Sequence, residues 1–238
     1  MATDTAGSLA ASRASEKENA AGKMSATAYV AMRRNILDNV WTVGFQATEI
    51  EISELLGMSR TPVREALMRL QQEGLIKVTP RHGMRVLPVS PDDMKQIYQI
   101  LTSLESTAAE LVAARGLSAE ELKPLKRASE AMDEALAADD LDAWAQADEQ
   151  FHTHLLDLCG NEMLRAVVLN FWDRAHRARM VTLRIRPKPV NSTKEHGALV
   201  SAIRKGDVAK AGAVQRAHRE RAGEELLGLL TRLGLSAL

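Results

Sequence analysis

The sequence predicts a mostly α-helical protein in two parts: an N-terminal winged helix-turn-helix with a small β-hairpin wing, and a C-terminal all-α antiparallel helical bundle. Three observations support this fold class. Aromatic residues make up only 3% of the 238 residues while 45% are hydrophobic, a mix that suits helices better than a β-sandwich or barrel. A single hairpin signature interrupts the helical periodicity near residue 80. Beyond residue 90, turn residues become rare and the helical patterns lengthen.

The composition also excludes several classes of protein. Lys and Arg number 31, as do Asp and Glu, so the formal net charge is zero; this argues against a general polyanion binder but allows a local basic patch. The longest apolar runs, such as Ala166–Leu169, are too short to cross a bilayer. No signal segment opens the chain, and Cys159 has no second cysteine for a disulfide. We therefore expect a cytoplasmic protein with no membrane partner.

The N-terminal region contains an arm and then a compact mixed domain. Residues 1–24 are rich in Ala, Ser and Thr and are predicted to form a disordered arm, and residues 25–88 are predicted to form the winged helix-turn-helix domain. Its helices are predicted over Tyr29–Val40, with Val30 and Val40 among the core positions, over Thr48–Leu56 with Gly57 as C-cap, and from Ser59 to about Glu73.

A β-hairpin follows these helices. Two β-rich stretches, Leu75–Thr79 and Met84–Leu87, are joined by Pro80-Arg81-His82-Gly83. Glycine at the end of such a short connection provides the backbone freedom that the turn needs. The sequence therefore predicts a two-stranded wing directly after the third helix.

The remaining residues, 89–238, are predicted to form a helical bundle. Its first helix begins at Ser90-Pro91-Asp92-Asp93, where proline occupies the first helical position and an acid follows at the third. Apolar residues at three- and four-residue spacing continue this helix to Leu111. Further helices are predicted at about 118–138, 140–158, 161–185, 193–205 and 208–232. Because short loops join them, an antiparallel bundle is expected, separated from the first domain near residues 88–90.

The third helix has the pattern of a DNA-reading helix. One face carries the apolar residues Val63, Ala66, Leu67 and Leu70, while Thr61 faces the opposite way, flanked by Arg60, Arg64 and Arg69. Residues 59–85 contain six basic and only two acidic side chains. Such a helix fits the major groove, and the hairpin tip at His82 would then reach the minor groove. The alternative is a solvated basic helix in an ordinary helical protein.

Four residues of the bundle form a candidate metal site. Asp148 and His152 lie one helical turn apart, His196 lies in the first turn of a helix that opens with the capping box Ser192–Glu195, and His218 lies in the last helix. If these helices line one cavity, the four side chains suit Zn²⁺, with Ni²⁺ and Mn²⁺ as alternatives. By spacing alone, a pair of helix-surface side chains is the commoner interpretation of Asp148 and His152.

The first domain resembles a known family of DNA-binding proteins. The run Ser59–Leu70, followed by Glu73-Gly74-Leu75-Ile76 and Arg81-His82-Gly83, closely resembles the winged helix-turn-helix of the GntR family of bacterial transcription regulators. The resemblance implies that Arg60, Thr61 and Arg64 contact DNA and that His82 and Gly83 do so at the wing. One departure is Ile50, which stands where some members carry a DNA-contacting arginine.

The second domain resembles the effector domain of the FadR-type subfamily, usually called FCD. The resemblance rests on Asp148–Leu155, Glu195-His196 with Gly206-Asp207, and Ala217-His218. It implies that Asp148, His152, His196 and His218 ligate a divalent metal and that a small carboxylate effector completes the metal shell. Members often hold this acid with an arginine in the first helix of the domain, where this chain has Leu101. Arg174 or Arg177 are the predicted substitutes, with a solvated basic face as the competing interpretation.

These features together predict a ligand-responsive DNA-binding transcription regulator, acting as a repressor, that binds an operator duplex as a homodimer. Two alternatives stay open. In the first, the protein is a regulator in which the metal itself is the signal or has a purely structural role. In the second, the bundle is a metal-dependent hydrolase or lyase. The enzyme alternative is disfavoured because Asp148 and the three histidines are all used as ligands and no separate general base stands out. We therefore expect no enzymatic activity.

Overall fold

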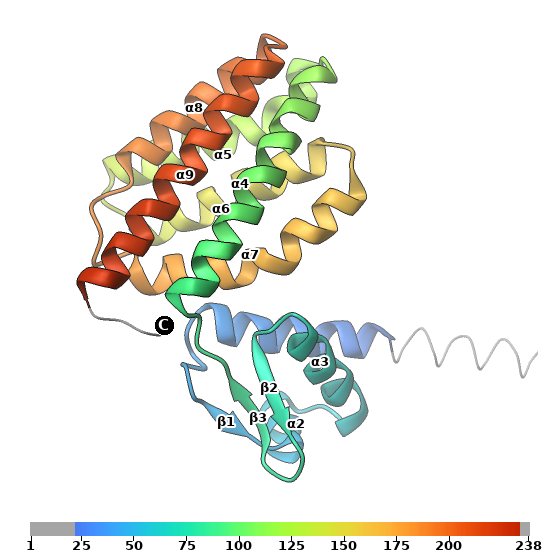
Figure 1. Cartoon of the computed structure of the whole chain (residues 1–238). Helices are drawn as coiled ribbons and strands as arrows, with labels where there is room; N and C mark the ends of the chain where they lie inside the picture. The colour runs from blue at the N-terminus through green and yellow to red at the C-terminus, as the bar shows by residue number, and fades with distance from the viewer. Residues whose placement is uncertain (1–21, 234–238) are drawn as a thin grey trace, which may run out of the picture. The chain divides into compact units, whose positions relative to one another are not determined.

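The computed structural model describes residues 22–233 and divides into two compact units, one ending at Pro88 and the other beginning at Val89 (Figure 1). The predicted mostly α fold, with a small sheet in the first unit and a helical bundle in the second, is confirmed. The arm predicted over residues 1–24 lies outside the described residues except for 22–24, which are helical. Within residues 22–233, no helix is long and apolar enough to cross a membrane.

The first unit combines helices with a three-stranded antiparallel sheet. A helix over residues 22–37 precedes β1 (Gln46–Ala47), α2 (Glu49–Leu56), α3 (Arg60–Gln72), β2 (Ile76–Thr79) and β3 (Gly83–Val86). The strand order is β1-β3-β2, so β3 is central and Ala47 pairs with Met84. The sequence analysis missed β1 because a two-residue strand has no periodicity to detect.

The first helix of this unit begins earlier than predicted, and two of its predicted core positions are exposed. Ala28, Met32 and Ile36 are fully buried at four-residue spacing, whereas Val30 and Val40 are 60% and 66% exposed. The helix is attached to the end of α3: the Tyr29 hydroxyl donates to the Glu73 carboxylate at 3.0 Å, and the Arg69 guanidinium lies 3.6 Å above the Tyr29 ring. The predicted core positions Val30 and Val40 were therefore wrong.

The α2–α3 pair forms as the sequence indicates. The Thr48 side chain and Glu51 make a reciprocal capping box at the start of α2, and Gly57 ends that helix in the left-handed conformation with φ of 62°. The predicted inner face of α3 is confirmed, because Val63, Ala66, Leu67 and Leu70 are all buried. This packing leaves the opposite face of α3 free for contacts outside the domain.

The hairpin tip depends on a glycine at residue 83. Gly83 has φ of 75°, and a Cβ atom there would collide with the backbone carbonyl of Ala47 in β1. The close pairing of β1 with β3 therefore requires a residue without a side chain. This gives Gly83 a structural role in the wing, separate from its predicted contact with DNA.

An unfavourable backbone conformation typically lowers the free energy of unfolding by roughly 1–3 kcal/mol. We expect the Gly83→Ala substitution to lower that of the first unit by more than this, because the added Cβ atom also collides with Ala47. Gly57→Ala is the matched control, since Gly57 also has positive φ but a Cβ atom added there would meet no atom within 4 Å. Chemical denaturation of both variants measures the difference. Equal destabilisation by the two substitutions would contradict the collision.

The second unit consists of six helices within the described chain. They are α4 (Pro91–Ala114), α5 (Ala119–Ala137), α6 (Leu141–Leu158), α7 (Glu162–Thr182), α8 (Val190–Arg204) and α9 (Val208–Arg232). Most begin where a short polar side chain accepts from a backbone amide of the first turn, as Ser90, Ser118, Asn161 and Asp207 do. These caps explain why most helix starts were predicted to within a residue or two.

The start of α8 differs from the prediction. The expected capping box at Ser192–Glu195 does not form; α8 begins at Val190, so His196 lies in its second turn. The Thr193 hydroxyl accepts a hydrogen bond from the Trp144 indole at 2.9 Å inside the bundle, and Glu195 pairs with α9 instead of capping α8. Tertiary contacts thus outweigh the local capping pattern.

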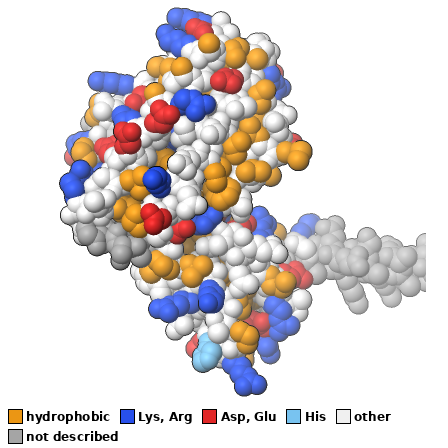
Figure 2. Space-filling view, in the orientation of Figure 1, with side chains coloured by type: hydrophobic (Ala, Val, Ile, Leu, Met, Phe, Trp, Pro, Cys, Tyr) orange, Lys and Arg blue, Asp and Glu red, His pale blue; other side chains and the backbone are white. Residues whose placement is uncertain are grey.

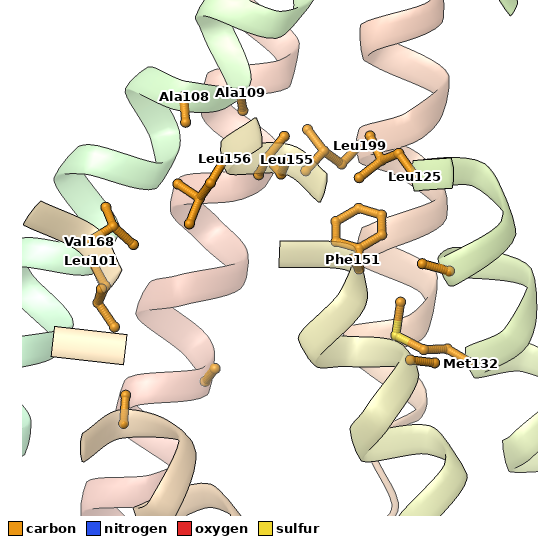
Figure 3. Packing of buried hydrophobic residues seen from close by; sticks show 14 of the residues in the cluster. Leu101, Ala108, Ala109, Leu125, Met132, Phe151, Leu155, Leu156, Val168 and Leu199 are labelled. Carbon is orange, nitrogen blue, oxygen red and sulfur yellow. The ribbon is translucent and has the colours of Figure 1, made fainter. Parts of the chain in front are cut away.

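An apolar core fills the bundle. α4 packs along α9, α5 along α6, and α8 against both α5 and α9. Leu101, Phe151, Leu155 and Leu199 lie in the resulting cluster with no exposed surface (Figure 3). Several polar side chains are buried as deeply, and they gather around the predicted metal ligands: Glu105, Asp148, His152, His196, Gln215, His218 and Arg219. This polar cluster is where a functional site is to be sought.

Candidate functional site

The structure brings the four predicted metal ligands together inside the bundle. Asp148 and His152 come from α6, His196 from α8 and His218 from α9. A ring nitrogen of each of the three histidines lies within 4.8 Å of one on each of the others. Oδ1 of Asp148 lies 3.7 Å from Nε2 of His152 and 3.9 Å from Nε2 of His196. The three imidazoles therefore face one point, and the Asp148 carboxylate lies beside two of them.

These separations fit a divalent metal with a small inward movement. Metal–ligand bonds of about 2.1 Å place neighbouring ligand atoms about 3.0–3.4 Å apart around one ion. The separations of 3.7 and 3.9 Å exceed this by a few tenths of an ångström, and the three histidine nitrogens, which lie within 4.8 Å of one another, would also have to move closer together. Among the described residues, the buried Nε2 atoms of His152 and His196 have no hydrogen-bond partner. A metal ion would satisfy both atoms, so the residues fit the group.

Nδ1 of each histidine contacts a group that is not one of the four candidate ligands. Nδ1 of His218 lies 2.8 Å from Oε2 of Glu195, Nδ1 of His152 lies 3.1 Å from Oε2 of Glu105, and Nδ1 of His196 lies 3.2 Å from the sulfur of Met132. The Glu195 carboxylate can accept a hydrogen bond from Nδ1 of His218, which leaves Nε2 of that ring as an electron-pair donor for a metal. The Glu105 carboxylate can do the same for His152, whose Nδ1 also lies 3.0 Å from Nη2 of Arg219, a group that only donates.

Electrostatics keep the ligands in their metal-binding protonation states. Burial lowers the pKa of His152, His196 and His218, so all three imidazoles are neutral near pH 7. Burial opposes ionisation of Asp148, but the positive charge of Arg179 outweighs it, with smaller support from Arg219 and, once they are protonated at low pH, from the imidazoles, and the pKa of Asp148 stays below its usual range. Neutral imidazoles and an ionised carboxylate are the forms that bind a cation.

A buried ion pair supports the site from α4 and α9, and the sequence analysis missed it. The Arg219 guanidinium donates two hydrogen bonds to Glu105 at 2.7 and 2.8 Å, and the Gln215 amide donates a third to the same carboxylate at 2.8 Å. Nη2 of Arg219 also lies 3.0 Å from Nδ1 of His152. Glu105 is separated from its partners by 110 and 114 residues, so no local pattern could reveal the pairing.

Two arginines other than the predicted pair line a small hollow beside Asp148. The hollow has a volume of about 10 Å³ and is bordered by Asp148, Arg179, Arg186 and His176, with apolar side chains completing its wall. Arg174 and Arg177, predicted to hold an effector, are not among its lining residues. The spacing along α7 explains this. Arg179 lies on the same helical face as Trp172, whose ring centroid is 5.0 Å from that of His152, whereas Arg174 and Arg177 lie on other faces.

The other two histidines of the bundle differ in their surroundings. His176 is only 8% exposed and lines the hollow, whereas His154 is half-buried and lies outside the three-histidine group. Leu101, which stands where the resembled subfamily often has an acid-binding arginine, is fully buried in the apolar cluster and cannot bind an acid (Figure 3).

The candidate DNA-contacting side chains lie on the outer face of the first unit. Arg60, Thr61 and Arg64 are exposed on α3, and His82 is exposed at the hairpin tip. In the space-filling view, Lys and Arg side chains gather around α3 and the hairpin of this unit (Figure 2). A basic surface around an exposed helix is suited to a DNA duplex.

A single carboxylate of α2 holds two of these arginines. Glu49 accepts from Nε of Arg60 at 2.9 Å and from Nε of Arg64 at 2.8 Å. These bonds lower the pKa of Glu49, with the Arg64 hydrogen bond as the largest cause. The two guanidinium groups are thereby kept side by side at the start of α3. The sequence analysis missed this pairing, because Glu49 and the two arginines lie on different helices.

Comparison with known protein families assigns both units. Residues 24–86 match the family model described as "Bacterial regulatory proteins, gntR family", and residues 96–221 match the FCD domain. The two matches fall on either side of the division between the compact units. Together they cover most of the described chain.

Individual relatives agree with these matches. The chain is 45% identical over 145 residues, 60% of this chain and 84% of the relative, to an uncharacterized HTH-type transcriptional regulator in the TAR-I ttuE-ttuC' intergenic region of Agrobacterium vitis. It is 30% identical over 166 residues to the HTH-type transcriptional repressor GlaR of Escherichia coli, covering 66% and 74% of the two chains. The structure of E. coli McbR/YncC has the same fold, with a TM-score of 0.76 at 20% identity over 87% of this chain and 98% of that one.

Proposed function

This chain belongs to the GntR family of bacterial transcriptional regulators and carries an FCD domain, and on that premise we propose that it is a repressor whose DNA affinity is set by a metal-bound effector. The observation that carries the proposal is the convergence of Asp148 and three buried histidines in the FCD domain, two of them with unpartnered Nε2 atoms among the described residues. Burying polar nitrogen atoms without a partner lowers the stability of the fold, and a bound metal would provide that partner.

The proposed ligands are a divalent metal, Zn²⁺ in the first instance, and a small organic acid. Asp148, His152, His196 and His218 would hold the metal. Zn²⁺ suits mixed nitrogen and oxygen ligands, and Ni²⁺ or Mn²⁺ would accept the same donors. The bound metal supplies a positive centre with room for a carboxylate oxygen. The acid would change DNA binding only by favouring one arrangement of the protein over another.

On the DNA side, we propose that Arg60, Thr61 and Arg64 enter the major groove of an operator and that His82 and Gly83 contact the adjacent minor groove. A homodimer would present two such helices to the half-sites of a pseudo-palindrome. The support is the exposed basic face of α3, with Glu49 holding both arginines ready at its N-terminal end. The metal as the sole signal is the second candidate, since the same four ligands would also bind a metal without an acid.

One experiment separates these proposals. Duplexes selected from a randomised library by the purified protein provide an operator probe, and fluorescence anisotropy then measures affinity in the apo form, with Zn²⁺, and with Zn²⁺ plus a panel of small organic acids. We expect an acid to weaken binding only when zinc is present. A response to zinc that no acid modifies would support the metal as the signal. No response to either ligand would contradict both versions.

We expect the Arg64→Ala substitution to weaken operator binding by about tenfold or more, because one bidentate contact with a base contributes roughly 1–3 kcal/mol. Arg165→Ala is the matched control, since Arg165 is a partly exposed bundle arginine paired with Asp157. Anisotropy at several salt concentrations measures the affinity of each protein. Unchanged affinity of the Arg64 variant, with zinc content equal to that of the parent, would remove Arg64 from the contact set.

A further inference from the structure

The hollow beside Asp148 contains more positive charge than its surroundings neutralise. The charged side chains that line it are Arg179 and Arg186 against Asp148 alone. Arg179 is only 8% exposed, and its Nη1 lies 3.7 Å from Oδ2 of Asp148. In the part of the chain that the structure describes, the buried Nη2 of Arg179 and the buried Nε of Arg186 have no hydrogen-bond partner. Donors of this kind are suited to an anion.

Other nearby charges do not cancel this excess. Glu105 is already paired with Arg219, and Glu195 with Arg221. Glu225, which acts on Arg186 from a distance, is itself paired with Arg221 at 2.9 Å. Burial lowers the pKa of Arg186, the direction expected for a cation removed from water.

A metal would increase the imbalance. A divalent ion held by one carboxylate and three neutral imidazoles retains one net positive charge, and Asp148 would then be shared between that ion and Arg179. Together with two guanidinium groups, the site would carry about three positive charges in a largely buried space. A ligand with a single carboxylate would leave two of them uncompensated, which is unfavourable where water is scarce.

We propose that the effector is a small dianion, in which one anionic group binds the metal and the second binds Arg179 and Arg186. This inference rests on the proposed function, since it requires the metal-bound acid. The two arginines stand in for the arginine absent at Leu101, and they approach from the end of α7 and the segment that follows it. Arg186 lies on that segment between α7 and α8 and lines the hollow from outside the helices.

The size of the hollow limits the ligand. About 10 Å³ accommodates roughly one water molecule, so the second anionic group would enter by displacing the flexible guanidinium arms and not by filling an existing pocket. A carboxylate or a phosphonate meets this requirement equally well, because both accept hydrogen bonds from guanidinium groups. The inference therefore specifies two anionic groups on a short carbon chain and leaves the second group to the experiment.

The test compares matched acids on the zinc-loaded full chain by calorimetry. Dicarboxylates of three to six carbons are paired with monocarboxylates of the same length, for example succinate with butyrate, and 3-phosphonopropionate replaces one carboxylate by a phosphonate. We expect at least one dianion to bind about tenfold or more tightly than its monoanionic partner, the effect of one charge-assisted contact. Preference for the dicarboxylate or for the phosphonate identifies the second group.

Substitutions locate the second group. We expect Arg186→Gln to remove most of the preference for the dianion while the affinity for the monoanion and the zinc content stay near those of the parent. Arg179→Gln should remove the same preference and is compared at saturating zinc, because Arg179 also faces the Asp148 ligand. Arg184→Gln is the matched control, because Arg184 is two residues from Arg186 but exposed and paired with Asp142. Zinc-dependent binding of monoanions and dianions with equal affinity would overturn the dianion inference and leave the proposed function intact. Acid binding that is absent or independent of zinc would overturn the proposed function as well.

Discussion

The His196→Ala substitution is expected to lower the affinity for Zn²⁺ by more than a hundredfold. Losing a partner outside the ligand shell typically costs 10–100-fold, and here a ligand itself is lost. His196 is fully buried, its ring centroid lies 4.5 Å from that of His218, and its Nε2 lies 3.9 Å from the Asp148 carboxylate. Competition with a chromogenic zinc chelator measures the affinity directly.

Two controls make this result interpretable. His154→Ala removes a half-buried histidine of the same bundle that lies outside the cluster, and it should leave zinc affinity unchanged. Because His196 also packs against Phe151, with ring centroids 4.3 Å apart, its removal creates a cavity, so unfolding in the presence of chelator must be measured for each variant. A folded His196 variant with the zinc affinity of the parent would refute the metal site.

The Glu105→Gln substitution is expected to destabilise the bundle by about 3–5 kcal/mol, the usual result of leaving one member of a buried ion pair uncompensated. Arg219 is only 1% exposed and has Glu105 as its bidentate partner. Glutamine keeps the volume and one acceptor oxygen, so the loss reports charge and not a cavity. Chemical denaturation of the apo protein measures the free energy of unfolding.

The double variant Glu105→Gln/Arg219→Met separates pairing from packing. Removing both charges should recover much of the lost stability, because apolar replacements of buried ion pairs are often well tolerated. Zinc affinity should still fall by about 10–100-fold in both variants, since Nδ1 of His152 loses the carboxylate that orients its ring. A single Glu105 variant as stable as the parent would show that the pair contributes nothing to the fold.

Much of the first unit could be predicted because its signals are local. The Gly57 C-cap and the buried face of α3 depend on residues a few positions apart, and the structure has both of them. The errors came where local signals were weak or were outweighed. β1 is too short for periodicity, the first helix extends further toward the N-terminus than predicted, and α8 begins before its apparent capping box because Thr193 bonds to Trp144.

The candidate site was also predicted in part. The ligand set Asp148, His152, His196 and His218 was predicted from helical spacing and a family resemblance, and the structure places the four side chains together. The arginines assigned to the effector, Arg174 and Arg177, were chosen by charge alone. Their orientation depends on which face of α7 meets α6, and that face carries Arg179 instead.

The two-part helical fold and the apolar and basic faces of α3 could be predicted from the chain, because helix periodicity and caps act over a few residues, and the four candidate ligands could be named with the help of the family resemblance. The environment of the candidate ligands could not. Glu105 meets Arg219 across 114 residues, Glu195 meets His218 across 23, and Arg186 lines the same hollow as Asp148 from a loop. These contacts arise only when helices pack, since burial makes each charge dependent on a partner that no local pattern specifies.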